Sequence, residues 1–276
     1  PQSLSLGALG PDGAVAILTT SSPSTTITTG TDWAGMQVDS GSVTQTVLVT
    51  IHRLPDTDRL LTQLDQYPLY YEFQVTPAGA LGEPVVVGVC PAASWTPPDP
   101  NRLRLAHNVA PYTDGSIEIL PFHEVPFLDC SDATLAAVPS GIPLFDFAQA
   151  GWRAVRPVLA SLLLPERLMA FATSGVGGTT KNFSPFGVVD TLVEMEANSP
   201  LTQRWPVGGT VPQPPSVRLH TPMGNALVGM AVNFAVTAGG GSLTGTSAAT
   251  DASGVATLGS WILGLTAGLN RVGATA

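Results

Sequence analysis

Apolar and polar residues alternate along several stretches of this chain, most clearly near its C-terminus. Within 230–237, a methionine, two valines and a phenylalanine fall on one side of an extended chain, and small or polar residues fall on the other. A period of two is typical of a half-buried β-strand. Three consecutive glycines, 239–241, follow and are expected to end the strand.

A turn and a second strand are predicted further along. In Asp251-Ala-Ser-Gly254, the aspartate side chain can cap the backbone of a turn, and glycine tolerates a positive φ. Val255, Thr257 and Trp261 then stand at alternating positions, which predicts a strand with these side chains on one face.

The order of these features, three glycines, then Asp-Ala-Ser-Gly-Val-Ala and Trp261, resembles the bacterial immunoglobulin-like repeat of group one, the module of intimins and invasins. The resemblance implies an Ig-like β-sandwich domain, which we place at 196–276. Such a module is a spacer or a binding surface, so the resemblance implies a fold more directly than a function.

Strand patterns also recur in the first two thirds of the chain. Residues 14–18 and 43–51 are apolar at alternating or successive positions, and Pro55 is expected to end the second of these strands. Two more strands, 70–75 and 85–89, flank a Pro-Ala-Gly-Ala-Leu turn. Residues 102–106 and 116–120 alternate as well.

The stretch from Tyr70 to Cys90 resembles the β-sandwich module shared by zonula occludens proteins, ankyrins and netrin receptors, in which an aromatic strand, a proline-glycine turn and a Pro-Val-Val-Val strand recur. Thr180-Lys-Asn-Phe-Ser-Pro-Phe-Gly-Val-Val189 is similar to the closing strand of bacterial relatives. The family's usual opening strand is not evident. The resemblance implies a β-sandwich over 1–195, so the fold class expected for the whole chain is mainly β, with two sandwich domains.

One segment breaks the β pattern. Between 143 and 170, apolar residues recur at spacings of three and four, which predicts an amphipathic helix near 144–164 inserted into the first domain. The helix could cover one sheet, or it could dock on another protein or near a lipid surface. The side chains of such an interface would be Phe145, Phe147, Trp152, Leu162, Leu163 and Leu164.

Composition excludes several classes of protein. Charged residues are 11% and the hydrophobic set 44%, so the chain can build a core. A net charge of −9 with only 11 Lys and Arg argues against nucleic-acid binding. No apolar run is long enough for a transmembrane segment. Because Pro1 is no translation start, we expect a removed upstream signal segment and a periplasmic or extracellular location.

The chain has two cysteines, Cys90 and Cys130. An even count in a strand-rich, exported chain favours one disulfide, with two free buried thiols as the alternative.

Patterns that could carry chemistry are incomplete. His123-Glu124 starts like a zinc-protease helix, but Pro126 forbids the helix and position 127 is not histidine, which favours a surface loop. The segment 175–181 lacks the glycine spacing of a phosphate-binding loop and is expected to be a flexible loop. The four histidines stand singly, without ligand spacing. We therefore predict no enzyme activity and no catalytic, cofactor or metal site.

The sequence thus favours a non-catalytic, extracytoplasmic structural or interaction protein whose partners are other proteins. It could be an extrinsic scaffold subunit that braces a larger membrane or envelope complex, such as a respiratory or photosynthetic one. The alternatives are a fragment of a cell-surface adhesin and a carbohydrate-binding accessory module.

Overall fold

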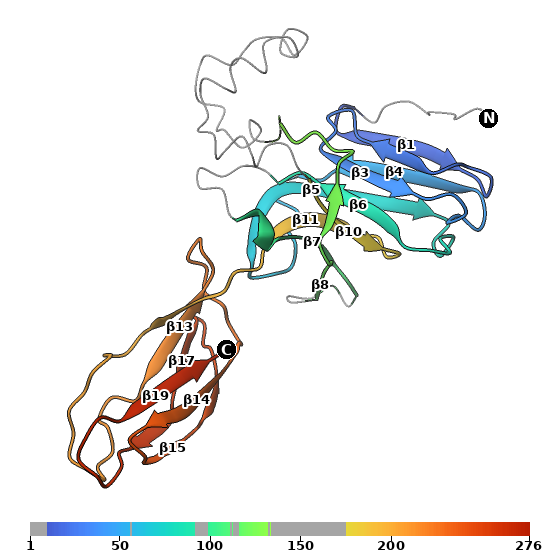
Figure 1. The fold of residues 1–276 in the computed structure, drawn as a ribbon. Helices are drawn as coiled ribbons and strands as arrows, with labels where there is room; N and C mark the ends of the chain where they lie inside the picture. The colour runs from blue at the N-terminus through green and yellow to red at the C-terminus, as the bar shows by residue number, and fades with distance from the viewer. Residues whose placement is uncertain are drawn as a thin grey trace, which may run out of the picture. The chain divides into compact units, whose positions relative to one another are not determined.

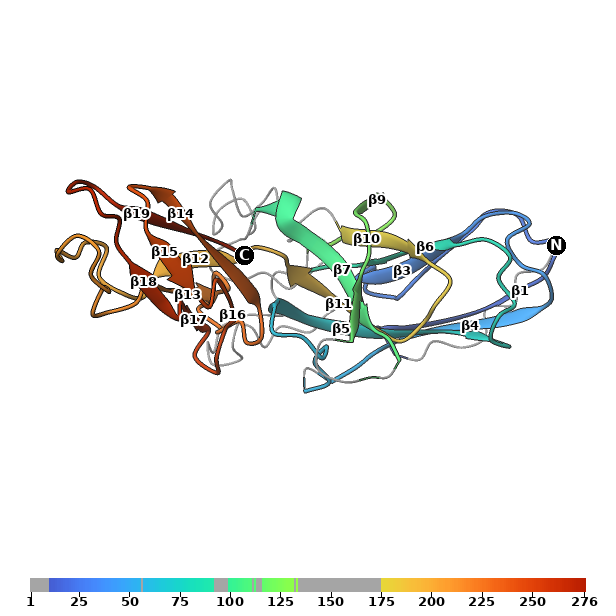
Figure 2. The ribbon, with the colours of Figure 1, turned by 90° about the horizontal axis from the view of Figure 1, so that it is seen from below.

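The fold is described from a computed structural model, which covers residues 10–55, 57–91, 99–110, 112, 116–131, 133 and 175–276. The chain divides into two compact units (Figures 1 and 2). Unit 1 consists of residues 1–62 and 66–191, and unit 2 of residues 63–65 and 192–276. The helix expected near 144–164, with Phe145, Phe147, Trp152 and Leu162 to Leu164, lies outside the described residues.

Two antiparallel sheets form unit 1. The six-stranded sheet has the order β1 (Gly13–Leu18), β4 (Val47–Arg53), β5 (Asp65–Thr76), β11 (Pro185–Asp190), β7 (Leu103–Asn108) and β8 (Ile117–Ile119). The five-stranded sheet has the order β2 (Thr25–Thr28), β3 (Ala34–Val38), β6 (Val85–Val89), β10 (Gly175–Thr180) and β9 (His123–Val125). The strands expected at 14–18, 70–75, 85–89, 102–106 and 116–120 are thus confirmed within a few residues.

The core of unit 1 lies between these sheets. Val49, Ile51 and Phe73 of the six-stranded sheet and Met36 and Val87 of the five-stranded sheet belong to one buried cluster. The alternation in β4 predicted this directly. Val47, Val49 and Ile51 are buried, whereas Leu48, between Val47 and Val49, is exposed. β5 and β6 are consecutive in the chain but lie in different sheets, so the turn between them crosses from one layer to the other.

The expectation of a flexible loop at 175–181 is wrong. Residues 175–180 form β10, an interior strand that pairs with both β6 and β9. Its glycines leave room for side chains from elsewhere: a Cβ added at Gly177 would lie 2.4 Å from Val125 Cγ1, and one at Gly178 would lie 2.4 Å from Leu120 Cβ. The His123-Glu124 pair is exposed as expected, but it lies in strand β9 rather than in a loop.

Unit 2 contains three small antiparallel sheets. These are β12 (Glu194–Ala197), β13 (Ser216–His220) and β17 (Val255–Thr257); β16 (Ser247–Ala249), β14 (Ala231–Ala238) and β19 (Arg271–Thr275); and the pair β15 (Ser242–Thr244) and β18 (Ser260–Ile262). Six buried side chains form its core: Leu219, Leu227, Val232, Phe234, Ala256 and Leu258.

The C-terminal pattern predicted β14 correctly, and the strand expected after the next turn is present in two pieces, β17 and β18. Val232 and Phe234 are buried, with exposed residues between them, and 239–241 all have positive φ. After the turn at 251–254, however, Ala256 and Leu258 are buried, whereas Thr257 is exposed. The small Ala256 is the side chain that fits beneath the sheet, and the chain divides there into β17 and β18, which belong to different sheets.

Candidate functional sites

The predicted disulfide is present. Cys90, which follows β6, is bonded to Cys130, which follows β9, with a Cα–Cα distance of 5.4 Å. Both residues are buried in the core of unit 1. Of the site residues predicted from sequence, these two are brought together, and the proposed interface residues lie outside the described part of the chain.

A buried histidine is the centre of a polar network in unit 1. His107 in β7 is fully buried, and its ring stacks on Phe186 of β11 with centroids 4.6 Å apart. Its Nδ1 lies 2.8 Å from Ser184 Oγ, and its Nε2 lies 3.1 Å from Glu118 Oε2. Burial lowers the pKa of His107 below its ordinary value, and the hydrogen bond and charge of Glu118 oppose that shift.

Serine, histidine and glutamate in contact resemble a catalytic triad, but the hydrogen bonds favour a structural role. Ser184 Oγ donates to the Asn108 carbonyl oxygen at 2.6 Å, so the serine hydroxyl hydrogen is directed to the backbone and not to the His107 ring. Ser184 is also buried. Sequence spacing could not reveal this network, because 77 residues separate His107 from Ser184 and only the pairing of β7 with β11 brings them together.

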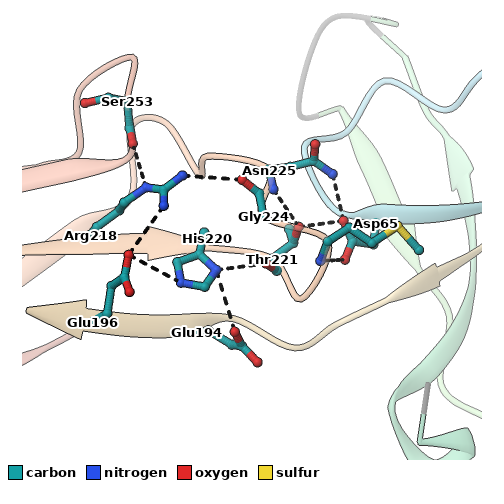
Figure 3. Close-up of polar contacts among 10 residues, drawn as sticks. Asp65, Glu194, Glu196, Arg218, His220, Thr221, Gly224, Asn225 and Ser253 are labelled. Carbon is teal, nitrogen blue, oxygen red and sulfur yellow. Dashed lines mark hydrogen bonds and ion pairs between the residues drawn. The ribbon is translucent and has the colours of Figure 1, made fainter. Parts of the chain in front are cut away.

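Unit 2 includes residues 63–65, and the buried carboxylate of Asp65 holds the turn between β13 and β14 (Figure 3). Asp65 accepts hydrogen bonds from Thr221 Oγ1 at 2.5 Å, from the Met223 backbone N–H at 2.9 Å and from Asn225 Nδ2 at 2.7 Å. Asp65 is 1% exposed, and Thr221 is fully buried. Three donors on one buried carboxylate satisfy its charge, so this group orders the turn.

A second polar cluster lies on strands β12 and β13 of unit 2 (Figure 3). His220 Nδ1 lies 2.9 Å from the Thr221 carbonyl oxygen and 3.6 Å from Glu194 Oε2, and its Nε2 lies 3.8 Å from Glu196 Oε1. Arg218 Nη1 lies 3.4 Å from the same Glu196 oxygen. These side chains compensate each other's charge across neighbouring strands and are partly exposed, so each pair contributes little to stability.

The turn at 251–254 has the chemistry that its sequence predicted. Asp251 Oδ1 accepts hydrogen bonds from Ser253 Oγ at 2.7 Å, Ser253 N at 2.8 Å and Val255 N at 3.0 Å. These hydrogen bonds lower the pKa of Asp251 below its ordinary value, and the bond from the Ser253 hydroxyl has the largest effect. Gly254 has a φ of 78° and supplies the positive backbone angle.

Large apolar side chains are exposed on unit 2. Leu201 and Leu265 are each 87% exposed and Leu269 is 67% exposed. Within the described residues, no group of three or more His, Cys, Asp or Glu side chains is arranged to hold a metal ion. None of the helices in the part of the chain that the structure describes is long and apolar enough to cross a membrane.

Comparison with known proteins identifies no family: no protein-family model matches this chain, and no curated protein matches it. The sheets and the disulfide define the class of protein: it is a mainly-β protein with several antiparallel sheets and one disulfide.

Proposed function

We propose that this chain is a non-catalytic, extracytoplasmic structural protein that acts through protein–protein contact, as an extrinsic scaffold subunit bracing a larger membrane or envelope complex. In this proposal the two compact units correspond to the domains expected at 1–195 and 196–276, and the second is an Ig-like domain of the bacterial group-one kind.

The observation that carries the proposal is the distribution of side chains on unit 2. Several of its ionisable groups are used within the unit: Asp65 holds a turn, and His220 and Arg218 face the carboxylates of β12. Its large apolar side chains, by contrast, are exposed. A surface whose polar clusters are internally paired and whose apolar groups are exposed suits contact with a partner better than chemistry on a substrate.

The disulfide supports the extracytoplasmic part of the proposal. Bonds such as Cys90–Cys130 persist in oxidising compartments and are rare where thiols are kept reduced. If the chain is exported, its intact mass, measured directly from cells with free thiols blocked, should rise by two hydrogen atoms on reduction. A chain recovered with both cysteines alkylated before reduction would contradict the export.

The function itself is tested by purification from the cells that make the protein. The full-length chain, tagged, is recovered from native membranes in a mild detergent, and its companions are quantified by mass spectrometry. We expect a constant stoichiometry with the subunits of one complex. An unrelated exported β-sandwich with the same tag is the control. Recovery of the chain without companions under every detergent condition would overturn the proposal.

A further inference from the structure

Two turns at one end of unit 2 carry the most exposed apolar side chains of the described chain. We call residues 201–209 and 264–270 together the tip. The tip side chains, with their exposed fractions, are Leu201 87%, Trp205 49%, Val207 50%, Leu265 87% and Leu269 67%. In Figures 1 and 2 both turns lie at the same end of unit 2.

Hydrogen bonds join the two turns of the tip. The Gly208 N–H donates to the Gly264 carbonyl at 3.2 Å, and the Leu263 N–H donates to the Gly209 carbonyl at 3.0 Å. A Cβ at Gly208 would lie 3.0 Å from Leu265 Cδ2, and one at Gly209 would lie 2.8 Å from Trp205 Cδ1. Leu265 and Trp205 therefore each lie against one glycine of the adjacent pair Gly208-Gly209.

The backbone of the tip satisfies part of its hydrogen bonding internally. The Gly209 N–H donates to the Pro206 carbonyl at 3.0 Å, and the Gly264 N–H donates to Asn270 Oδ1 at 3.2 Å. Pro206 has no N–H to satisfy. Because unpaired backbone groups make transfer out of water costly, these bonds lower the cost of moving the tip into a less polar environment.

The charge of the tip is one-sided. No Asp or Glu occurs in 198–217 or in 252–276. Arg204 and Arg271 are exposed, and among the described residues neither has a carboxylate partner. The chain as a whole has a net charge of −9, so an anionic surface would repel most of the protein and attract this end.

We propose that the tip inserts into the headgroup region of an anionic lipid bilayer. Tryptophan and leucine on protruding turns, with arginine beside them and no carboxylate, match the chemistry of that region, where an apolar body and basic groups are favoured together. Contact with lipid needs no protein partner, so the inference goes beyond the proposed scaffold function and can fail or succeed independently of it.

The test is co-sedimentation of the purified full-length chain with phosphatidylcholine vesicles, with and without phosphatidylglycerol. We expect binding that increases with phosphatidylglycerol and weakens with salt. Leu265→Ser and Leu269→Ser together should lower the partition coefficient by about tenfold per leucine. Arg204→Gln should lower it several-fold, and only on the anionic vesicles.

Met223→Ser is the matched control, because Met223 is 53% exposed and lies in the Thr221–Asn225 turn, outside the tip. Its binding should equal that of the unchanged chain. Brominated lipids should quench tryptophan fluorescence in the unchanged chain, and Trp205→Phe should remove that quenching while binding persists. Because the substituted side chains are exposed, circular dichroism and the unfolding midpoint should be unchanged.

Absence of vesicle binding would overturn the proposal, and so would equal binding by the double leucine variant. Sedimentation equilibrium measures whether the chain self-associates through the tip. If the unchanged chain self-associates and the leucine variant does not, the tip is a contact between copies of this chain, and the lipid proposal is rejected.

Discussion

The two units use apolar side chains in opposite ways. In unit 1, large side chains such as Tyr71, Phe73 and Phe186 are completely buried between two broad sheets, and a disulfide lies within the same core. In unit 2, six buried side chains form the core, whereas Leu201 and Leu265 are 87% exposed. Unit 1 thus buries its large apolar side chains in an extensive core, whereas unit 2 has a small core and exposes apolar side chains on its surface.

The sharpest test of this comparison removes one core phenylalanine from each unit. Phe186→Ala and Phe234→Ala should each cost about 3 to 5 kcal/mol. Because unit 2 has few other buried side chains, Phe234→Ala should abolish the protection of its amides, while Phe186→Ala leaves unit 1 folded but less stable. Hydrogen exchange followed by mass spectrometry assigns each loss to a unit. Native protection of unit 2 in Phe234→Ala would contradict the comparison.

Removing the disulfide should affect unit 1 alone. The bridge spans 40 residues, and a loop of that length implies a stabilisation of about 4 kcal/mol from the restricted unfolded chain. Cys90→Ala with Cys130→Ala should lower the urea midpoint of unit 1. The same double variant under reducing conditions is its own control, since reduction should then have no effect. A change confined to unit 2 would show that the attribution is wrong.

A smaller effect is expected where β10 packs closely on its neighbours. Gly178→Ala places a Cβ about where Leu120 stands, with 2.4 Å between the two Cβ atoms, and should cost roughly 1 to 3 kcal/mol by overpacking. Adding Leu120→Gly, which removes the clashing Cβ, should relieve the close contact, so the double variant should be more stable than the two separate losses predict. Strict additivity in urea titrations would show that the close approach is not the cause.

The smallest effect concerns pH and again separates the units. Burial lowers the pKa of His107, so the folded chain binds its proton less readily than the unfolded chain, in which the pKa is about 6.5. The stability that neutral His107 contributes is present above that pH and is lost as the pH falls from there toward the lowered value. His107→Gln should flatten this part of the stability curve of unit 1.

The control for this prediction is His220→Gln in unit 2. His220 keeps 15% of its side chain exposed and lies beside two glutamates, so its replacement should leave the pH dependence of unit 1 intact. Urea midpoints between pH 5 and 8 measure both variants. If His107→Gln retains the full slope, the buried histidine is not its source.

Sequence patterns predicted several of the strands in which large side chains alternate, although β3, with Met36 and Val38 buried, was not among them. β4 and β14 show this, because the residues that alternate along the chain are the ones that face the core. β10 could not be predicted in this way. Its glycines carry no side chains, and its burial comes from Val125, Leu128 and Leu120, which belong to other parts of the chain.

After residue 254, the alternation of Val255 with Thr257 predicted a strand without its buried face, and the structure shows that Ala256 is buried and Thr257 exposed. Among the functional features, cysteine count predicted the disulfide. The His107 network and the Asp65 carboxylate could not be predicted, because their partners are far away in the sequence. Ser184 is 77 residues from His107, and Thr221 is 156 residues from Asp65.

The bonds that close the 264–270 turn also have a practical consequence. The Gly264 N–H donates a hydrogen bond to Asn270 Oδ1, and the Leu269 backbone packs closely against Gly239. Both ends of the turn are therefore fixed by groups outside the exposed positions 265–268. Foreign peptides grafted at those positions should be displayed without loss of the surrounding sheets. The protein therefore offers a scaffold on which short recognition loops can be exchanged.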